Sequence, residues 1–412
     1  MDSQQLLYLI LGIVIFDYLF DQILDYLNLK NSTSKLPEDL KGIYNDEEYA
    51  KSQDYQKVQS LFSFKTAAFN TLLSVLVIAF GGFGLLDGFL SDYVSNPILL
   101  GLAFIGVLFI LSDLINLPFE IHSTFGIEAK FGFNKTTVKT FILDKLKGYL
   151  IGGIIGFLLG YAVLWLIGAL GPNFWLSALL LVAGFTLFMN LFYTSLILPM
   201  FNKLSPLEDG VLKSQIEFYA NKVDFPIDHI LVIDGSKRSS KANAFFSGLG
   251  KKKKVVLYDT LIEKQTDEEL VAVLAHEVGH YKKKHIVLSL VLSVVQMAFT
   301  FFIMSLLIFN ENLSLALGSS DLSIHINLIA FGLLYSPISR VTGLLMNILS
   351  RKNEYEADEF AATTFAPAPL QSALKKLSVT SLSNLTPHPA YVFVNYSHPP
   401  LLKRLEAMEK FK

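Results

Sequence analysis

Residues 151–170 read IGGIIGFLLGYAVLWLIGAL and contain no Asp, Glu, Lys or Arg. A helix needs about 20 mostly apolar residues to cross the hydrocarbon core of a bilayer. Residues 174–201 form a second run without charge, and only the tripeptide GPN separates the two runs. The two runs therefore predict a pair of transmembrane helices joined by a short turn.

Five further apolar segments surround this pair along the chain. The complete set of predicted spans is 5–27, 67–90, 97–119, 149–170, 174–200, 286–310 and 324–346. We therefore predict an all-α integral membrane protein with seven transmembrane helices. The first span is the least apolar, because Asp17, Asp21 and Asp25 interrupt it. These residues share one helix stripe, which faces either the interior of the helix bundle or the inner headgroups.

The composition agrees with a membrane protein and excludes several other classes. Of the 412 residues, 52% are hydrophobic and 17% are charged, whereas soluble proteins contain about 25% charged residues. The net charge of −2 gives no general attraction to nucleic acid, so the predicted surroundings are a lipid bilayer and not a nucleic acid. The absence of cysteine excludes disulfides, thiolate metal ligands and a cysteine nucleophile.

Lysine residues indicate the orientation in the membrane. They are frequent in segments 28–66 and 120–148, whereas segments 91–96, 171–173 and 311–323 contain neither Lys nor Arg. Positive residues concentrate in cytoplasmic loops. We therefore expect the N-terminus outside and the C-terminus in the cytoplasm, after seven spans.

Two longer blocks between and after the spans are expected on the cytoplasmic side. They divide the chain into four predicted parts: helices 1 to 5 with their loops (1–200), a first catalytic part (201–285), helices 6 and 7 (286–346) and a second catalytic part (347–412).

The strongest chemical signal lies in the first block, at residues 271–285, which read VAVLAHEVGHYKKKH. His276 and His280 are four positions apart, so both imidazoles can reach one metal ion from the same helix face. Glu277 is rotated by about 100° and can lie beside a metal-bound water. Thr266, followed by Glu269, gives a capping box that predicts where this helix begins.

A catalytic zinc ion takes three protein ligands and keeps one open position. The third ligand is expected in the acidic segment SRKNEYEADEFAA, residues 350–362, where Glu354 and Asp358 share one helix face. Asp358 can orient either histidine through its second ring nitrogen. His285 is a weaker candidate ligand, because it lies on another part of the helix and near the membrane boundary.

Three further residues are candidates for binding substrate or intermediate. His398 can stabilise an oxyanion, and Arg404 can bind a carboxylate such as a free C-terminus. Residues 243–248 and 255–258 read as a β-hairpin, which is either an ordinary hairpin or an edge that takes an extended peptide. In the second case Asn243 can hydrogen-bond the substrate backbone.

These motifs together resemble the integral-membrane CAAX prenyl protease family, the zinc endopeptidases that process prenylated proteins. The resemblance extends over nearly the whole chain. It is carried, besides HEVGH, by EEYAKSQDYQ (47–56), STFGIEAKFGFNKTT (123–137), LPMFNKLSPLEDG (198–210), SKRSSKANAFFSG (236–248), SRKNEYEADEFA (350–361) and NLTPHPAYVFVNYSHPPLLKRL (384–405).

The resemblance implies seven transmembrane helices around a hollow chamber, with an α+β zinc protease domain on the cytoplasmic side. The implied substrate is a peptide or protein, with or without a prenyl group, from which C-terminal residues are removed. The implied site residues are the zinc ligands His276, His280 and Glu354, the catalytic Glu277, Asp358 and His398, and the substrate-binding Asn243 and Arg404.

Two departures from the eukaryotic pattern favour a bacterial inner-membrane protein over an endoplasmic reticulum protein. The connector 258–266 is short, and the C-terminal EAMEKFK has no dilysine signal. Two other functions stay open: a zinc protease for quality control of membrane proteins, and a transporter or channel with a structural zinc site. The sequence gives neither the natural substrate nor the oligomeric state.

Overall fold

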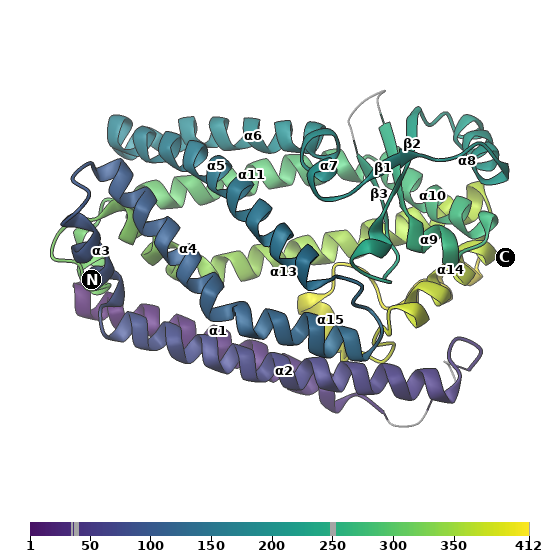
Figure 1. Ribbon diagram of the computed structural model, residues 1–412, viewed down its shortest axis with the longest axis horizontal. Helices are drawn as coiled ribbons and strands as arrows, with labels where there is room; N and C mark the ends of the chain where they lie inside the picture. Colours follow the sequence, from purple (N-terminus) through teal and green to yellow (C-terminus); the bar gives the residue numbers. More distant parts are fainter. Residues whose placement is uncertain (34–35, 37–40, 248–252, 412) are drawn as a thin grey trace.

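The computed structural model describes residues 1–33, 36, 41–247 and 253–411. Figure 1 shows an elongated molecule in which long helices run along the longest axis and a small sheet with shorter helices is gathered at one end. The N-terminus lies at one end of this axis and the C-terminus at the other.

The long helices form the larger part of the molecule. Their bounds are α1 Ser3–Lys30, α2 Asp46–Ala79, α4 Pro97–Ile121, α5 Val138–Leu170, α6 Phe174–Leu196, α11 His285–Leu307 and α13 Ile324–Thr364. By length and composition, the described residues contain six helical stretches that can cross a membrane, and one of them, Val138–Phe201, is 64 residues long. This stretch includes α5, the short 3₁₀ helix η3 (Gly171–Asn173), α6 and α7 (Leu198–Phe201).

Polar pairs connect neighbouring long helices. Arg340 of α13 pairs with Asp17 and Asp21 of α1, at 3.1 and 2.6 Å. Asn70 of α2 donates to Asn116 of α4 at 2.9 Å. Asp17, Asp21 and Arg340 therefore face a neighbouring helix, which agrees with the expectation that charges in apolar surroundings pair with one another.

The predicted span 67–90 is interrupted in the structure. Helix α2 ends at Ala79, Gly81 adopts a left-handed conformation with φ 65°, and the separate helix α3 (Gly82–Ser91) follows. A Cβ at Gly84 would lie 1.8 Å from the carbonyl oxygen of Gly318, so α3 packs backbone to backbone against a later loop. Hydropathy does not detect this break, because both helices are apolar.

The sheet has four strands in the order β1-β2-β4-β3. Their bounds are β1 Leu204–Pro206, β2 Ile227–Ile233, β3 Ala244–Ser247 and β4 Lys253–Tyr258. The antiparallel pairing of β3 with β4 confirms the predicted hairpin, and its turn lies outside the described residues. Strand β3 is at the edge of the sheet and offers one side for pairing.

Shorter helices surround the sheet and connect the long helices. They are η2 His122–Glu128, α8 Val211–Lys222, η4 Gly235–Lys237, α9 Asp259–Lys264, α10 Asp267–Lys282, α12 Glu311–Ala316, α14 Pro367–Thr380, α15 Pro389–Asn395 and α16 Leu401–Glu409. Leu270, Leu274, Ala275 and Val278 of α10 are buried in the largest apolar cluster. Helix α10 is therefore the central element of this half.

Helix α13 belongs to both halves of the molecule. Its 41 residues continue without interruption from the long-helix region to the acidic segment that contains Glu354 and Asp358. The predicted division between residues 346 and 347 thus falls inside one helix.

Candidate metal centre

The helix that contains the two histidines begins as its sequence predicts. The Thr266 hydroxyl accepts from the Glu269 N–H at 3.3 Å, and the Glu269 carboxylate accepts from the Thr266 N–H at 2.8 Å. This reciprocal cap fixes the start of α10. With the apolar side of the helix buried in the core, His276 and His280 are presented together toward α13.

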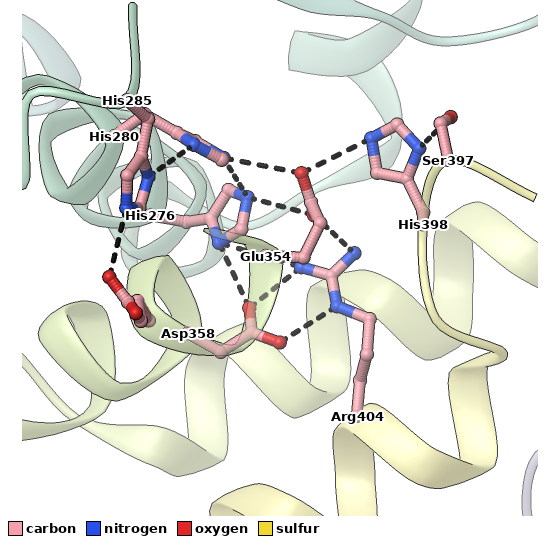
Figure 2. Close-up of polar contacts among 9 residues, drawn as sticks. His276, His280, His285, Glu354, Asp358, Ser397, His398 and Arg404 are labelled. Carbon is pink, nitrogen blue, oxygen red and sulfur yellow. Dashed lines mark hydrogen bonds and ion pairs between the residues drawn. The ribbon is translucent and has the colours of Figure 1, made fainter. Parts of the chain in front are cut away.

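Helix α13 approaches α10 very closely at Gly279. A Cβ at this position would lie 3.0 Å from both the Cα and the carbonyl oxygen of Ala357. Because glycine has no side chain, the two helices can cross at this short distance. Glu354 and Asp358, on either side of Ala357, are thereby placed against the histidine pair (Figure 2).

Three metal-ligating side chains converge at this crossing. His276 Nε2 lies 3.2 Å from His280 Nε2 and 3.4 Å from Glu354 Oε2, and His280 Nε2 lies 3.3 Å from Glu354 Oε1. Ligands about 2.05 Å from a tetrahedral metal ion are separated by roughly 3.3 Å. The buried Glu354 Oε2 makes no hydrogen bond within the described chain. Spacing, chemistry and this unsatisfied oxygen all fit a divalent metal ion.

His276 is held from behind by a buried ion pair. Its Nδ1 lies 2.9 Å from Asp358 Oδ1. Arg404 donates to both oxygens of Asp358, at 2.8 Å from Nε and 2.7 Å from Nη2. Burial lowers the pKa of His276, but hydrogen bonds with Asp358 and Glu354 outweigh it and raise the pKa to about 9. A metal ion must therefore displace a proton here.

The commitment of Arg404 to Asp358 constrains its predicted role in binding substrate. Arg404 is 8% exposed, and its Nη1 lies 3.4 Å from Glu354 Oε2. Its Nε and Nη2 atoms, which could bind a substrate carboxylate through two hydrogen bonds, already donate to Asp358. Its contact with substrate stays a prediction, and Nη1 is the atom left to make it.

His398 lies on the open side of the site. Its Nε2 is 3.3 Å from Glu354 Oε1, its Nδ1 is 2.9 Å from Ser397 Oγ, and its side chain is 62% exposed. Arg351 of α13 bonds the carbonyls of Val392 and Tyr396 at the end of α15. Helix α13 therefore supplies Glu354 and also anchors the loop that carries His398.

Two cavities meet at the metal centre. A smaller one, of about 170 Å³, is lined by Asn243, His276, Glu354, His398 and Arg404. A larger one, of about 500 Å³, is lined by Phe245, Phe246, His280, Ile286 and Asn190. Glu277 lines both cavities, and so does the β3 edge, through Ala244 on one side and Phe245 on the other. An extended chain that crosses the metal centre would pass Glu277.

All eight residues predicted from the sequence are near this centre, but two contacts were not foreseen. Sequence reasoning left open which histidine Asp358 orients, and the structure places it on His276. It also set His285 aside, whereas His285 contacts His280. The spacing of five residues carried no signal, because the contact depends on a turn between two helices.

Family comparisons cover the chain almost from end to end. Residues 25–203 match the family described as CAAX prenyl protease N-terminal, five membrane helices, and residues 206–412 match Peptidase family M48. The chain belongs to the CAAX prenyl protease family. The resemblance noted in the sequence is thus confirmed.

Relatives named CAAX prenyl protease align with this chain over nearly their full length. The CAAX prenyl protease 1 homolog of Oryza sativa subsp. japonica is 35% identical, over 97% of this chain and 96% of its own. CAAX prenyl protease 1 of Saccharomyces cerevisiae is 35% identical, over 97% of this chain and 94% of its own. The crystal structure of S. mikatae Ste24p covers 98% of this chain and 99% of its own, with TM-score 0.93 and 32% identity.

These findings decide between the function classes left open by the sequence. A CAAX prenyl protease is a membrane metalloprotease, so the chain is an enzyme and not a channel with a structural metal. The relatives named above are eukaryotic and give no support to the predicted bacterial origin. That prediction relied on the length of one connector and on a tail signal, and neither feature identifies the source of the chain.

Proposed function

We propose that this protein is a zinc endopeptidase in which His276, His280 and Glu354 hold the ion and Glu277 is the general base. The observation that carries this proposal is the convergence of three side chains, whose two imidazole Nε2 atoms lie 3.2 Å apart and 3.3–3.4 Å from the two oxygens of one carboxylate. Two imidazoles and one carboxylate form a donor set of catalytic zinc sites. The position of Glu277, beside the metal centre and open to both cavities, supports its role.

When bound, zinc supplies Lewis acidity that acidifies a water molecule and polarises a carbonyl group. The side chains supply the proton transfers and the orientation. The Glu277 carboxylate takes a proton from the attacking water and later delivers it to the leaving amine nitrogen. His398 Nε2 donates a hydrogen bond to the oxygen that becomes negative during attack.

Other residues hold the partners in place. Asp358, fixed by Arg404, accepts a hydrogen bond from His276 Nδ1–H and so keeps Nε2 directed at the metal. The Asn243 side chain donates to a backbone carbonyl of a substrate that pairs with the β3 edge. Asn243 Oδ1 accepts from the Ala244 N–H at 2.9 Å, which orients the amide group.

We propose that the substrate is a peptide or protein that carries an apolar group near its C-terminus, such as an isoprenoid, and that the enzyme removes C-terminal residues. The titles of the relatives support this class. The larger cavity supports it as well, because Leu187, Phe245, Phe246, Ile286 and Leu290 give it mainly apolar walls.

We propose seven spans, with the N-terminus outside and the metal centre on the cytoplasmic side. A single helix of 64 residues would be about 96 Å long, three times the thickness of the bilayer core. Gly171, with φ 54°, separates α5 from α6, and these two helices contact each other. The two termini lie at opposite ends of the long axis in Figure 1, which agrees with an odd number of spans.

We further propose that the ring of long helices encloses a hollow chamber that opens on the metal centre. Contacts run from α1 to α2, from α4 through α5, α6 and α11 to α13, and back to α1. Asn190 of α6 lines the larger cavity beside His280, so polar groups from the membrane helices reach the site.

The test is proteolysis by the purified chain against a panel of prenylated and unprenylated peptides, with products identified by mass spectrometry. We expect cleavage that stops with a chelator and returns with zinc. Glu277→Gln should retain one zinc per chain and lose turnover, whereas His276→Ala should lose zinc. Cleavage by Glu277→Gln would refute the general base. Equal cleavage of misfolded membrane proteins without a C-terminal preference would favour the quality-control function.

A further inference from the structure

A tight turn places a third histidine beside the metal helix. In a continuous helix, the residue five positions after His280 would be rotated by about 140° and could not contact it. Instead α10 ends at Lys282, Lys284 adopts the left-handed conformation with φ 60°, and α11 begins at His285. His285 Nδ1 consequently lies 3.1 Å from His280 Nδ1 (Figure 2).

His285 is connected in turn to a carboxylate of α13. Its Nε2 lies 3.1 Å from Glu356 Oε2, and the residue is only 5% exposed. Glu356 stands two positions after Glu354 on the same helix. A carboxylate, one imidazole and a second imidazole therefore lie in series and end at the candidate metal centre.

The positions of the protons follow from this order. His280 directs Nε2 toward His276 and Glu354, so its neutral ring carries the proton on Nδ1. That N–H donates to His285 Nδ1, which must then be unprotonated. The proton of His285 therefore resides on Nε2 and is donated to the Glu356 carboxylate. This arrangement gives each ring nitrogen one partner and keeps the lone pair of His280 Nε2 available.

We propose that His285 and Glu356 are positioning residues that fix the tautomer and orientation of His280 for metal binding. The inference rests on the proposed function, because it takes His280 as a metal ligand. Each ligand histidine is then oriented by a carboxylate, in one case directly and in the other through a second histidine. Asp358 contacts His276 directly, whereas Glu356 acts on His280 through His285.

The experiment measures zinc affinity of the full chain in detergent by competition with a chelator. We expect His285→Ala and Glu356→Ala to weaken zinc binding by about 10- to 100-fold, the usual effect of losing a partner behind a metal-bound histidine. Glu359→Ala is the matched control, because it removes an exposed carboxylate from the same helix. Zinc content at saturation should remain one ion per chain.

Conservative variants separate positioning from packing. The carbonyl of His285→Gln can accept a hydrogen bond from His280 Nδ1–H, and the carbonyl of Glu356→Gln can accept one from His285 Nε2–H. We expect each to recover most of the affinity lost in the alanine variant. Should His285→Ala fail to fold, the Glu356 pair still provides the test, because the Glu356 side chain is 33% exposed. Unchanged affinity in Glu356→Ala, or equal losses with Ala and Gln, would overturn the inference.

The same measurements identify which proposal fails. If the wild type binds no zinc, or if His276→Ala still binds one ion per chain, the proposed metal site is wrong. If zinc is bound and lost in His276→Ala, while His285→Ala and Glu356→Ala bind it as the wild type does, only the positioning role is wrong.

Discussion

Helices α10 and α11 follow one another along the chain, yet their surroundings are opposite. Nine of the 16 residues of α10 are buried within the protein, whereas in α11 only His285 and Ser305 of 23 residues are buried. Helix α11 is nevertheless the more apolar of the two, which is expected of a helix that faces lipid. Packing within the protein therefore fixes the candidate metal centre, whereas the helix that follows it is mostly exposed.

The largest effect is expected from breaking the buried ion pair behind His276. Arg404→Ala leaves the buried Asp358 carboxylate without the guanidinium that donates to both of its oxygens, and removing one partner of a buried pair typically destabilises by about 3–5 kcal/mol. We expect a lower unfolding temperature and a loss of bound zinc. Lys403→Ala, at an exposed neighbouring position of α16, is the control. Equal stability of the two variants would show that the ion pair does not hold the site.

A smaller loss is expected where α10 and α13 cross. Gly279→Ala would bring a methyl group to 3.0 Å from the backbone of Ala357, and overpacking of this kind costs about 1–3 kcal/mol. The same shift would move His280 relative to Glu354, so zinc affinity should fall with stability. Gly332→Ala in α13 is the control, because among the described residues no other element comes within 4 Å of the added Cβ. Similar unfolding temperatures for the two variants would contradict the tight crossing.

The cap of α10 predicts a dependence of stability on pH. Burial raises the pKa of Glu269, but the ammonium group of Lys376, Ser372 and the Thr266 N–H outweigh it and hold the pKa below its ordinary value. A lowered pKa stabilises the fold above the unfolded value, about 4.3, and this contribution is lost as the pH falls through the folded pKa.

Glu269→Gln should therefore lower stability at neutral pH by about 1–2 kcal/mol, from loss of a charged hydrogen bond at the cap. The difference from the wild type should shrink as the pH falls below 4. Unfolding temperatures recorded between pH 7 and pH 3.5 measure it. A difference that stays constant over this interval would exclude the carboxylate charge as its source.

The residues of the candidate metal centre can be selected from the sequence because their spacing is local. His276, Glu277 and His280 lie within one helical turn, and Glu354 and Asp358 lie within another. What it could not supply is the crossing of the two helices, which depends on Gly279, and the contact of His285, which depends on the left-handed turn at Lys284. Both depend on the conformation of the backbone, which leaves no pattern in hydrophobicity or residue spacing.

Hydropathy locates the apolar segments of the chain, but it does not locate the residues where the helices begin and end. Helix α2 ends at Ala79 inside the predicted span 67–90, because Gly81 turns the chain. Helix α13 continues beyond the predicted limit at 346, because the polar segment that contains Glu354 and Asp358 extends the same helix to Thr364. Hydropathy reports where lipid surrounds a helix and not where the helix ends.

The smallest effect is expected in the ring of long helices. Asn70→Leu removes the bond to Asn116 between α2 and α4, and hydrogen bonds between membrane helices contribute about 0.6 kcal/mol on average. We expect a small decrease in unfolding temperature and unchanged zinc affinity, since the pair lies outside the metal centre. Thr66→Val, in the same helix, removes a hydroxyl that donates to the Phe62 carbonyl of its own helix and serves as the control. Asn70→Leu could instead lower the unfolding temperature as much as Gly279→Ala. Contacts between the long helices would then contribute as much to stability as the packing around α10, which would contradict the contrast between these two regions.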